Sequence, residues 1–263
     1  MVLILTDLDG TLLDQETYEW SPARPALERL RRKGIPWIPI TSKTRAEVEV
    51  WRRRLGHSHP FIVENGGAAF IPEGYFPGGV AGARQRDGYE VLEWGEPYQQ
   101  LVADLEIAAE ECGCRVLGFQ AMTPDVVASE CGMQREDALL AKQREYDEPF
   151  VVLDEGKDEV LKAAIVRRGR KWTRGGRFWH ILGENDKATA ALALIALYRR
   201  QWHEVQTIGL GDGLNDVPFL LRVDHPVLIR SSRVQELQAA VPQGFVTTQP
   251  GPAGWNEAVL RFT

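Results

Sequence analysis

The chain has 263 residues, of which 44% are hydrophobic and 26% charged, and 31 Lys and Arg against 37 Asp and Glu give a formal net charge of −6. This composition is typical of a globular protein and excludes intrinsic disorder, which needs lower hydrophobicity and a stronger charge imbalance. The acidic balance argues against a nucleic-acid partner. No apolar run approaches the roughly 20 residues that span a bilayer, which argues against a membrane protein.

The start of the chain and its cysteines favour a cytoplasmic protein. Residues 2–5 are apolar, but Asp7 and Asp9 follow where a secretory signal would continue its apolar stretch. Three cysteines in so long a chain are too few for a disulfide framework, and their spacing is not that of a zinc site. We expect free thiols in a reducing compartment.

The first part of the chain alternates short apolar runs with helical patterns. The runs predict strands over residues 2–6, 35–41 and 61–63. A helix is expected to begin near Ser21 and another at Thr44, where Thr44 and Glu47 form a capping box. Strands that alternate with helices indicate βαβ units and a parallel sheet, that is, an α/β fold.

The pattern changes after residue 70, where glycines and prolines crowd a short stretch that is typical of a domain boundary. The next 100 residues have an α+β pattern, with helices over 98–111 and 159–168 and a hairpin over 171–182. The βα pattern then resumes with a helix over 187–200 and strands over 207–210 and 227–229. We therefore expect a parallel-sheet core of residues 1–83 and 184–263, interrupted by an inserted domain of residues 84–183.

Two carboxylates, Asp7 and Asp9, directly follow the first predicted strand. In open α/β sheets, ligands bind beyond the carboxyl ends of the strands. The one-residue gap places both side chains on the same side of an extended chain, and Gly10 lets the backbone turn away. Alone, the pair could equally be turn carboxylates.

A second acidic cluster, Asp212 to Asp216, follows a later strand in the stretch GLGDGLND. A dinucleotide site is excluded because Leu214 stands where the last glycine of that fingerprint belongs, and because the carboxylates would repel a pyrophosphate. Asp7, Asp9 and Asp212, all at strand ends, instead predict an oxygen-rich site suited to Mg²⁺.

Other polar residues fit a phosphate beside that cation. Thr41 and Ser42 end the second predicted strand and offer a hydroxyl and backbone donors. Lys187 stands at a helix start, where the helix dipole and the ammonium both favour an anion.

The order of these residues resembles the four motifs of the haloacid dehalogenase (HAD) superfamily of aspartate-nucleophile phosphatases. Asp7 and Asp9 match motif I, Thr41 motif II, Lys187 motif III, and the stretch from Gly211 to Asp216 motif IV. The resemblance covers nearly the whole chain and implies a Rossmann-like core with an inserted C2-type cap.

This resemblance implies a mechanism. Asp7 would attack phosphorus and form an aspartyl phosphate, and Asp9 would act as acid to the leaving alkoxide and then as base for water. Thr41 and Lys187 would hold the phosphoryl oxygens.

The resemblance also implies a metal site. Mg²⁺ would be held by the Asp7 carboxylate, the Asp9 main-chain carbonyl and the Asp212 carboxylate. Asp216 would orient Lys187 or a metal-bound water.

Shorter stretches resemble the mannosyl-3-phosphoglycerate phosphatase family within that superfamily. These stretches are TSKTRAE from Thr41, VENGG from Val63, REYDEPF from Arg144, and GGRF from Gly175 with His180. One departure is Ala188 after Lys187, where relatives often carry glycine. The resemblance implies a sugar-glycerate phosphate as substrate, in which the predicted binding residues are Ser42, Asn65, Gly66, Arg144, Arg177 and Asn215.

The residues of the inserted domain and the substrate each have alternative interpretations. Arg144 could instead form an ion pair with Glu145 or Asp147, Arg177 could be a surface charge of the hairpin, and His180 could be a packed strand residue. The substrate could be a glucosyl-3-phosphoglycerate or another sugar phosphate, and a phosphomutase uses the same core. A ligand-sensing module would be favoured only if the motif carboxylates were missing. The sequence does not indicate the oligomeric state.

Overall fold

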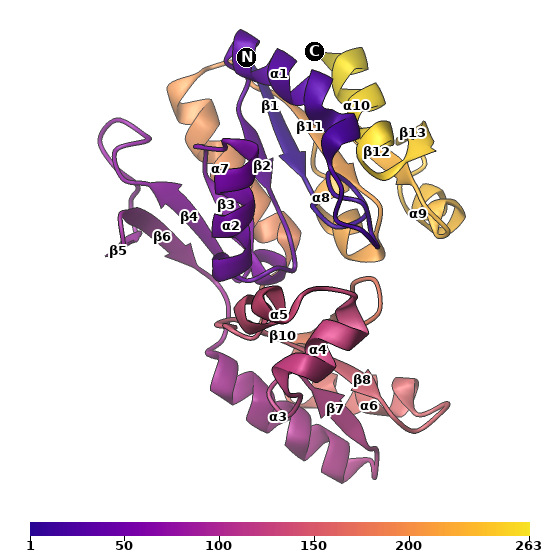
Figure 1. Cartoon of the computed structure of the whole chain (residues 1–263). Coiled ribbons are helices and arrows are strands. Elements are labelled where there is room, and N and C mark those ends of the chain that lie inside the picture. Colours follow the sequence, from indigo (N-terminus) through magenta and orange to yellow (C-terminus); the bar gives the residue numbers. More distant parts are fainter.

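The computed structural model describes all residues, 1–263, and builds the core on one five-stranded sheet (Figure 1). Its strand order is β13-β12-β11-β1-β2, and every neighbouring pair is parallel. These strands are β1 (Val2–Thr6), β2 (Trp37–Pro39), β11 (Gln206–Gly211), β12 (His225–Arg230) and β13 (Phe245–Pro250). The predicted α/β class with a parallel sheet is confirmed.

Helices cover both faces of this sheet because its strands are apolar on both sides. Along β1, Ile4 belongs to one buried cluster while Leu3 and Leu5 belong to the other. The first cluster contains residues of α1 (Arg24–Lys33), α2 (Arg45–Leu55) and α10 (Gly251–Phe262). The second contains residues of α7 (Lys187–Gln201), α8 (Val217–Leu220) and α9 (Val234–Ala240). The capping box at the start of α2 is formed, with Glu47 N–H donating to Thr44 Oγ1 at 3.2 Å.

A second sheet of four antiparallel strands extends from the core in the order β3-β4-β6-β5. The strands are β3 (Phe61–Val63), β4 (Ala68–Pro72), β5 (Arg84–Arg86) and β6 (Tyr89–Glu93). The predicted third strand, β3, therefore joins the parallel sheet only through one isolated bridge between Ile40 and Ile62.

Residues 84–93, which the composition assigns to the insertion, pair through β6 with β4, which precedes them. This pairing differs from the boundary expected at residue 84. A stretch rich in glycine and proline has the same composition whether it links two domains or, as here, forms a long loop between two strands of one sheet.

The remaining insertion forms a separate lobe beyond the end of β1 (Figure 1). Its antiparallel sheet has the order β7-β8-β10-β9. The strands are β7 (Val116–Gly118), β8 (Asp147–Val152), β9 (Lys171–Arg174) and β10 (Trp179–Leu182), and the helices are α3 (Tyr98–Glu111), α4 (Pro124–Cys131), α5 (Arg135–Ala141) and α6 (Asp158–Arg167). The predicted hairpin is β9–β10. No helix of the protein is both long and apolar enough to cross a membrane.

Candidate active site

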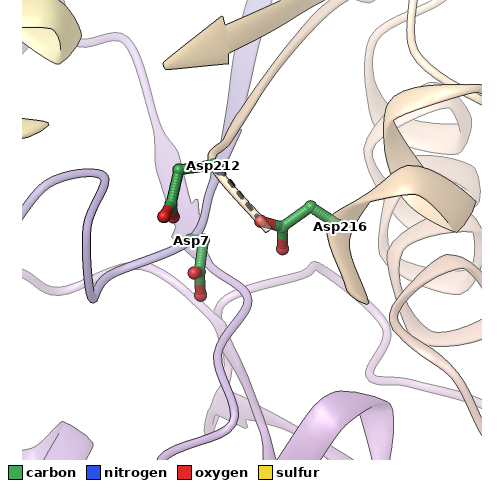
Figure 2. A group of neighbouring side chains, drawn as sticks. All are labelled: Asp7, Asp212 and Asp216. Atoms are coloured by element: carbon green, nitrogen blue, oxygen red, sulfur yellow. Dashed lines mark hydrogen bonds between the residues drawn. The ribbon is translucent and has the colours of Figure 1, made fainter. Parts of the chain in front are cut away.

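Three carboxylates meet at the carboxyl ends of two adjacent strands. Asp7 follows β1 and Asp212 follows β11, and the parallel register that pairs Thr6 with Leu210 brings these two ends together. Asp216, from the short 3-10 helix Leu214–Asp216, points into the same space (Figure 2). One carboxylate oxygen from each of the three aspartates lies within 4.8 Å of the others.

The turn after β1 brings its backbone close to the side chain of Asp212. Gly10 has a φ of +74°, and a Cβ there would lie 2.4 Å from Asp212 Oδ2. Thr11 in the same turn donates its hydroxyl to Asp212 Oδ1 at 2.9 Å. The turn therefore fixes the Asp212 side chain against the segment that carries Asp7 and Asp9.

Lys187, in the first turn of α7, is the cation nearest to these carboxylates. Its Nζ lies 3.0 Å from Asp7 Oδ1 and 2.6 Å from Asp216 Oδ1, and its side chain is 1% exposed. Asp186 caps the helix by accepting from the Thr189 N–H at 2.8 Å. The helix start thus places an ammonium group between the Asp7 and Asp216 side chains.

The cluster carries more negative charge than Lys187 offsets. Burial, together with the charges of Asp216 and Asp212, raises the pKa of Asp7 well above its usual value, although Lys187 acts in the opposite direction. Burial and the charge of Asp216 raise the pKa of Asp212 to about 7. Carboxylates that repel one another in a buried space are a suitable donor set for a divalent cation, whose charge relieves that repulsion.

Asp9 lies beside this cluster and has a different cationic partner. Its Oδ2 is 3.0 Å from the Nζ of Lys43, whereas its Oδ1 is buried and has no hydrogen-bond partner. Burial raises the pKa of Asp9 in spite of the opposing effect of Lys43. The structure therefore gives the two motif I aspartates separate lysines.

A cavity separates the carboxylate cluster from the inserted lobe and encloses about 840 Å³, including space open to solvent. Its core wall consists of Asp7, Asp9, Gln15, Tyr18, Ser42, Lys43, Glu47, Asp212, Gly213 and Asn215. Its opposite wall consists of Phe119, Cys131, Met133, Ala141, Arg144, Pro149, Gly175, Gly176, Arg177, Phe178 and His180. The cavity is thus a site between two lobes, with the acidic groups on one side only.

Ser42, Asn215 and Arg177, three of the predicted binding residues, line this cavity. Thr41 is fully buried behind it, and its Oγ1 accepts from the Lys43 N–H at 3.1 Å. Arg177 lies at the lobe's hairpin and donates a hydrogen bond to the Glu130 carbonyl.

Arg144, one of the predicted binding residues, makes its polar contacts within the protein. Its Nη2 lies 2.5 Å from Asp147 Oδ1 and donates to the Ser42 carbonyl at 2.9 Å, and its Nε is 3.7 Å from Glu64. The alternative, an ion pair with Asp147, is the arrangement in the structure. The arginine lines the cavity, but its N–H groups hold the two lobes together.

Asn65 and Gly66 also serve the packing between segments. Asn65 donates to Asp147 Oδ2 at 2.7 Å and accepts from Asn215 at 3.2 Å. Gly66 does not line the cavity, and a Cβ on it would lie 2.1 Å from the carbonyl oxygen of Asp186. This glycine allows the backbone to approach the start of α7.

The contact of Lys43 with Asp9 and that of His180 with Asp147 were not predicted from the sequence. His180 Nδ1 lies 3.0 Å from Asp147 Oδ2, and the ring lines the cavity. Lys43, Asp147 and His180 all belong to stretches on which the resemblance rests. No spacing rule predicts these contacts, since they join residues from separate strands and loops.

Solved structures with the same fold cover almost all of the chain. A HAD subclass IIB sugar phosphatase matches with a TM-score of 0.67 at 19% identity over 100% of this chain and 99% of that one. A sucrose-phosphatase from Synechocystis matches with a TM-score of 0.64 at 13% identity over 99% and 97%. The chain therefore shares the fold of these proteins, a Rossmann-like core with a cap.

Curated relatives define the family more narrowly, although no family model matches the chain. A glucosyl-3-phosphoglycerate/mannosyl-3-phosphoglycerate phosphatase from Methanococcoides burtonii is 42% identical over 98% of this chain and 96% of its own length. A protein of the same name from Persephonella marina is 37% identical over 99% and 97%. A mannosyl-3-phosphoglycerate phosphatase from Pyrococcus furiosus is 38% identical over 88% and 92%. The chain belongs to this family of phosphoric monoester hydrolases.

Proposed function

We propose that the protein hydrolyses mannosyl-3-phosphoglycerate to mannosylglycerate and phosphate, with Mg²⁺ as cofactor. The observation that carries this proposal is the cluster of Asp7, Asp212 and Asp216 around Lys187, in a chain of the family just named. The glucosyl analogue is a second candidate, because relatives at 42% and 37% identity carry both substrates in their names.

The reaction begins with the Asp7 carboxylate. One of its oxygens forms a bond to phosphorus while the bond from phosphorus to the glycerate oxygen breaks, and Asp9 gives its proton to that leaving oxygen. Asp9 then takes a proton from water, which attacks phosphorus and releases phosphate from Asp7. Each displacement is easier than direct attack by water on the substrate.

Lys187 and Thr41 bind the transferred phosphoryl group. Lys187 is buried, and Asp216 and Asp7 raise its pKa despite the opposing effect of burial, so that it stays an ammonium. A fixed, dehydrated positive charge stabilises the charge that develops on the phosphoryl oxygens without reorganisation. Asp216 holds this ammonium at 2.6 Å and thereby sets its position.

The metal would be held by the carboxylates of Asp7 and Asp212 and by the main-chain carbonyl of Asp9. Mg²⁺ prefers one or two carboxylates together with water and phosphate oxygens, and the donor set of this site is of that kind. When bound, the cation shields Asp7 from the negative phosphate and stabilises the transferring group.

The inserted lobe is proposed to select the substrate. We place the cap at residues 94–183, since β5 and β6 pair with the core-side strand β4. The cavity wall that it supplies includes Arg177, a suitable partner for the substrate's carboxylate or sugar hydroxyls.

The free thiols of all three cysteines fit a small-molecule enzyme of the cytoplasm.

The test is a panel of phosphate-release assays in the presence of Mg²⁺. Mannosyl- and glucosyl-3-phosphoglycerate are compared with hexose phosphates and sucrose phosphate. We expect kcat/KM for the mannosyl compound to be the highest and that for the glucosyl compound to be close to it. A clear preference for a hexose phosphate or sucrose phosphate would refute the proposed substrate while leaving the phosphatase chemistry in place.

A further inference from the structure

Lys43 is the cation that faces Asp9, and nothing in the mechanism above uses it. Its Nζ lies 3.0 Å from Asp9 Oδ2, and its side chain is only 5% exposed although it borders the cavity. The residue stands directly before Thr44, the N-cap of α2, at the carboxyl-end edge of the sheet.

The surroundings of Lys43 leave its ammonium little freedom. Glu47 Oε1 lies 3.4 Å from the Nζ, and the ring of Tyr18 lies 4.8 Å from it on another side. Glu47 is itself fixed by the capping box with Thr44, and Tyr18 donates its hydroxyl to the Cys131 carbonyl of the inserted lobe at 3.3 Å. The charges of Asp9 and Glu47 raise the pKa of Lys43 despite burial, so that the side chain is an ammonium.

The two carboxylate oxygens of Asp9 are therefore unequal. Oδ2 accepts from Lys43, whereas Oδ1 is buried with no hydrogen-bond partner. A buried polar atom without a partner costs free energy, and such atoms are found at catalytic positions. The contact with Lys43 is thus the side-chain interaction that fixes the orientation of the Asp9 carboxyl group.

We propose that Lys43 is a positioning residue for Asp9: by holding Oδ2 it orients the carboxyl group that delivers the proton to the leaving oxygen. This role rests on the proposed function. As the bond between Asp7 and phosphorus forms and the ester bond breaks, the electron pair goes to the leaving oxygen, which takes the proton from the Asp9 carboxyl group. Without Lys43 the Asp9 side chain loses this orientation, and general-acid catalysis, which contributes about 10²–10⁴-fold, is impaired.

The experiment measures kcat/KM on a series of phosphate esters whose leaving groups become steadily poorer, from 4-nitrophenyl to phenyl to alkyl phosphate. The value of kcat/KM reports the steps up to and including formation of the aspartyl phosphate, so the later attack by water does not affect it. The variants are Lys43→Met, Lys43→Arg and, as a matched control, Arg45→Met. The Arg45→Met substitution removes a nearby cation that pairs with Asp87 and not with Asp9.

We expect Lys43→Met to lose about 10- to 100-fold on the poor leaving groups and about threefold or less on 4-nitrophenyl phosphate, which needs little protonation. Lys43→Arg keeps a cation beside Asp9 and should recover part of this loss, and Arg45→Met should keep the wild-type dependence on the leaving group. A loss that is equal across the series would overturn the positioning role while leaving the proposed function intact. Absence of hydrolysis by the wild-type protein overturns both.

Discussion

The carboxylate of Glu64 accepts a hydrogen bond of 3.0 Å from the backbone N–H of Asp147, which lies 83 residues further along the chain. The same carboxylate accepts from the N–H groups of Glu145 and Tyr146 at 3.0 and 2.8 Å. Glu64 belongs to the turn between β3 and β4, and the other three residues lead into β8 of the inserted lobe. One buried side chain therefore fastens the lobe to the core beside the active site.

Removal of this carboxylate is expected to destabilise the protein. Glu64→Ala leaves backbone donors that are largely buried without an acceptor, which costs about 1–3 kcal/mol for an unsatisfied group. Glu64→Gln keeps one acceptor oxygen and should cost less. Urea unfolding of the two variants measures the difference. Equal stability of Glu64→Ala and the wild type would show that these hydrogen bonds do not hold the lobe.

Removal of either of two arginines of the inserted lobe should affect the stability of the protein to very different extents. Arg144→Ala breaks a buried pair with Asp147, and we expect a loss of about 3–5 kcal/mol in the free energy of unfolding. Arg177→Ala removes an exposed side chain and should leave stability within about 0.5 kcal/mol of the wild type.

Kinetic measurements test whether Arg177 contacts the substrate. Arg177→Ala should raise KM for a glycerate-bearing substrate far more than for a generic aryl phosphate, because only the former offers a carboxylate and sugar hydroxyls. If KM rose equally for both substrates, Arg177 would be a structural residue of the hairpin.

The pH dependence of stability should carry the signature of Glu148. Its side chain is buried, with partners Tyr98 at 2.7 Å and the Gln120 N–H at 3.0 Å, and burial raises its pKa from 4.5 to about 7. Between pH 4.5 and about pH 7 the folded state binds more protons at Glu148 than the unfolded state does. This group therefore makes the free energy of unfolding fall as pH rises.

Glu148→Gln cannot ionise and should lose this dependence. Near pH 5 its stability should resemble that of the wild type, and by pH 8 it should be the more stable protein by at most about 3 kcal/mol. Urea unfolding from pH 5 to 8, with chelator present, measures the difference, and Glu110→Gln on an exposed helix position is the control. A constant difference across this range would contradict the assignment.

The sequence predicts the parallel sheet and the carboxylate cluster because each depends on a local pattern. Asp7 and Asp212 come directly after apolar strands, and parallel strands bring their carboxyl ends together whatever the rest of the chain does. The hairpin of β9 and β10 was likewise predictable, since Gly175 and Gly176 stand between two strand-forming runs.

The partners of Arg144 and the position of β6 could not be predicted in this way. Arg144 contacts Ser42 and Glu64, which are 102 and 80 positions away in the sequence, so only the docking of the lobe decides between substrate and ion pair. Strand β6 follows a loop whose glycines and prolines resemble a linker. Lys43 has no distinguishing spacing, and its role depends on the rotamer of Asp9.

The most direct test of the proposed mechanism is phosphate release from mannosyl-3-phosphoglycerate by the wild type and by Asp7→Asn, with Mg²⁺ and with chelator. The repulsion among Asp7, Asp212 and Asp216 indicates that the site needs a cation, and Asp7 is the proposed nucleophile. We predict rapid release only by the wild type with Mg²⁺, and a loss of at least about 10³-fold in Asp7→Asn, which keeps its fold. Release by Asp7→Asn, or by the metal-free wild type, at a rate near that of the wild type with Mg²⁺ would contradict this mechanism.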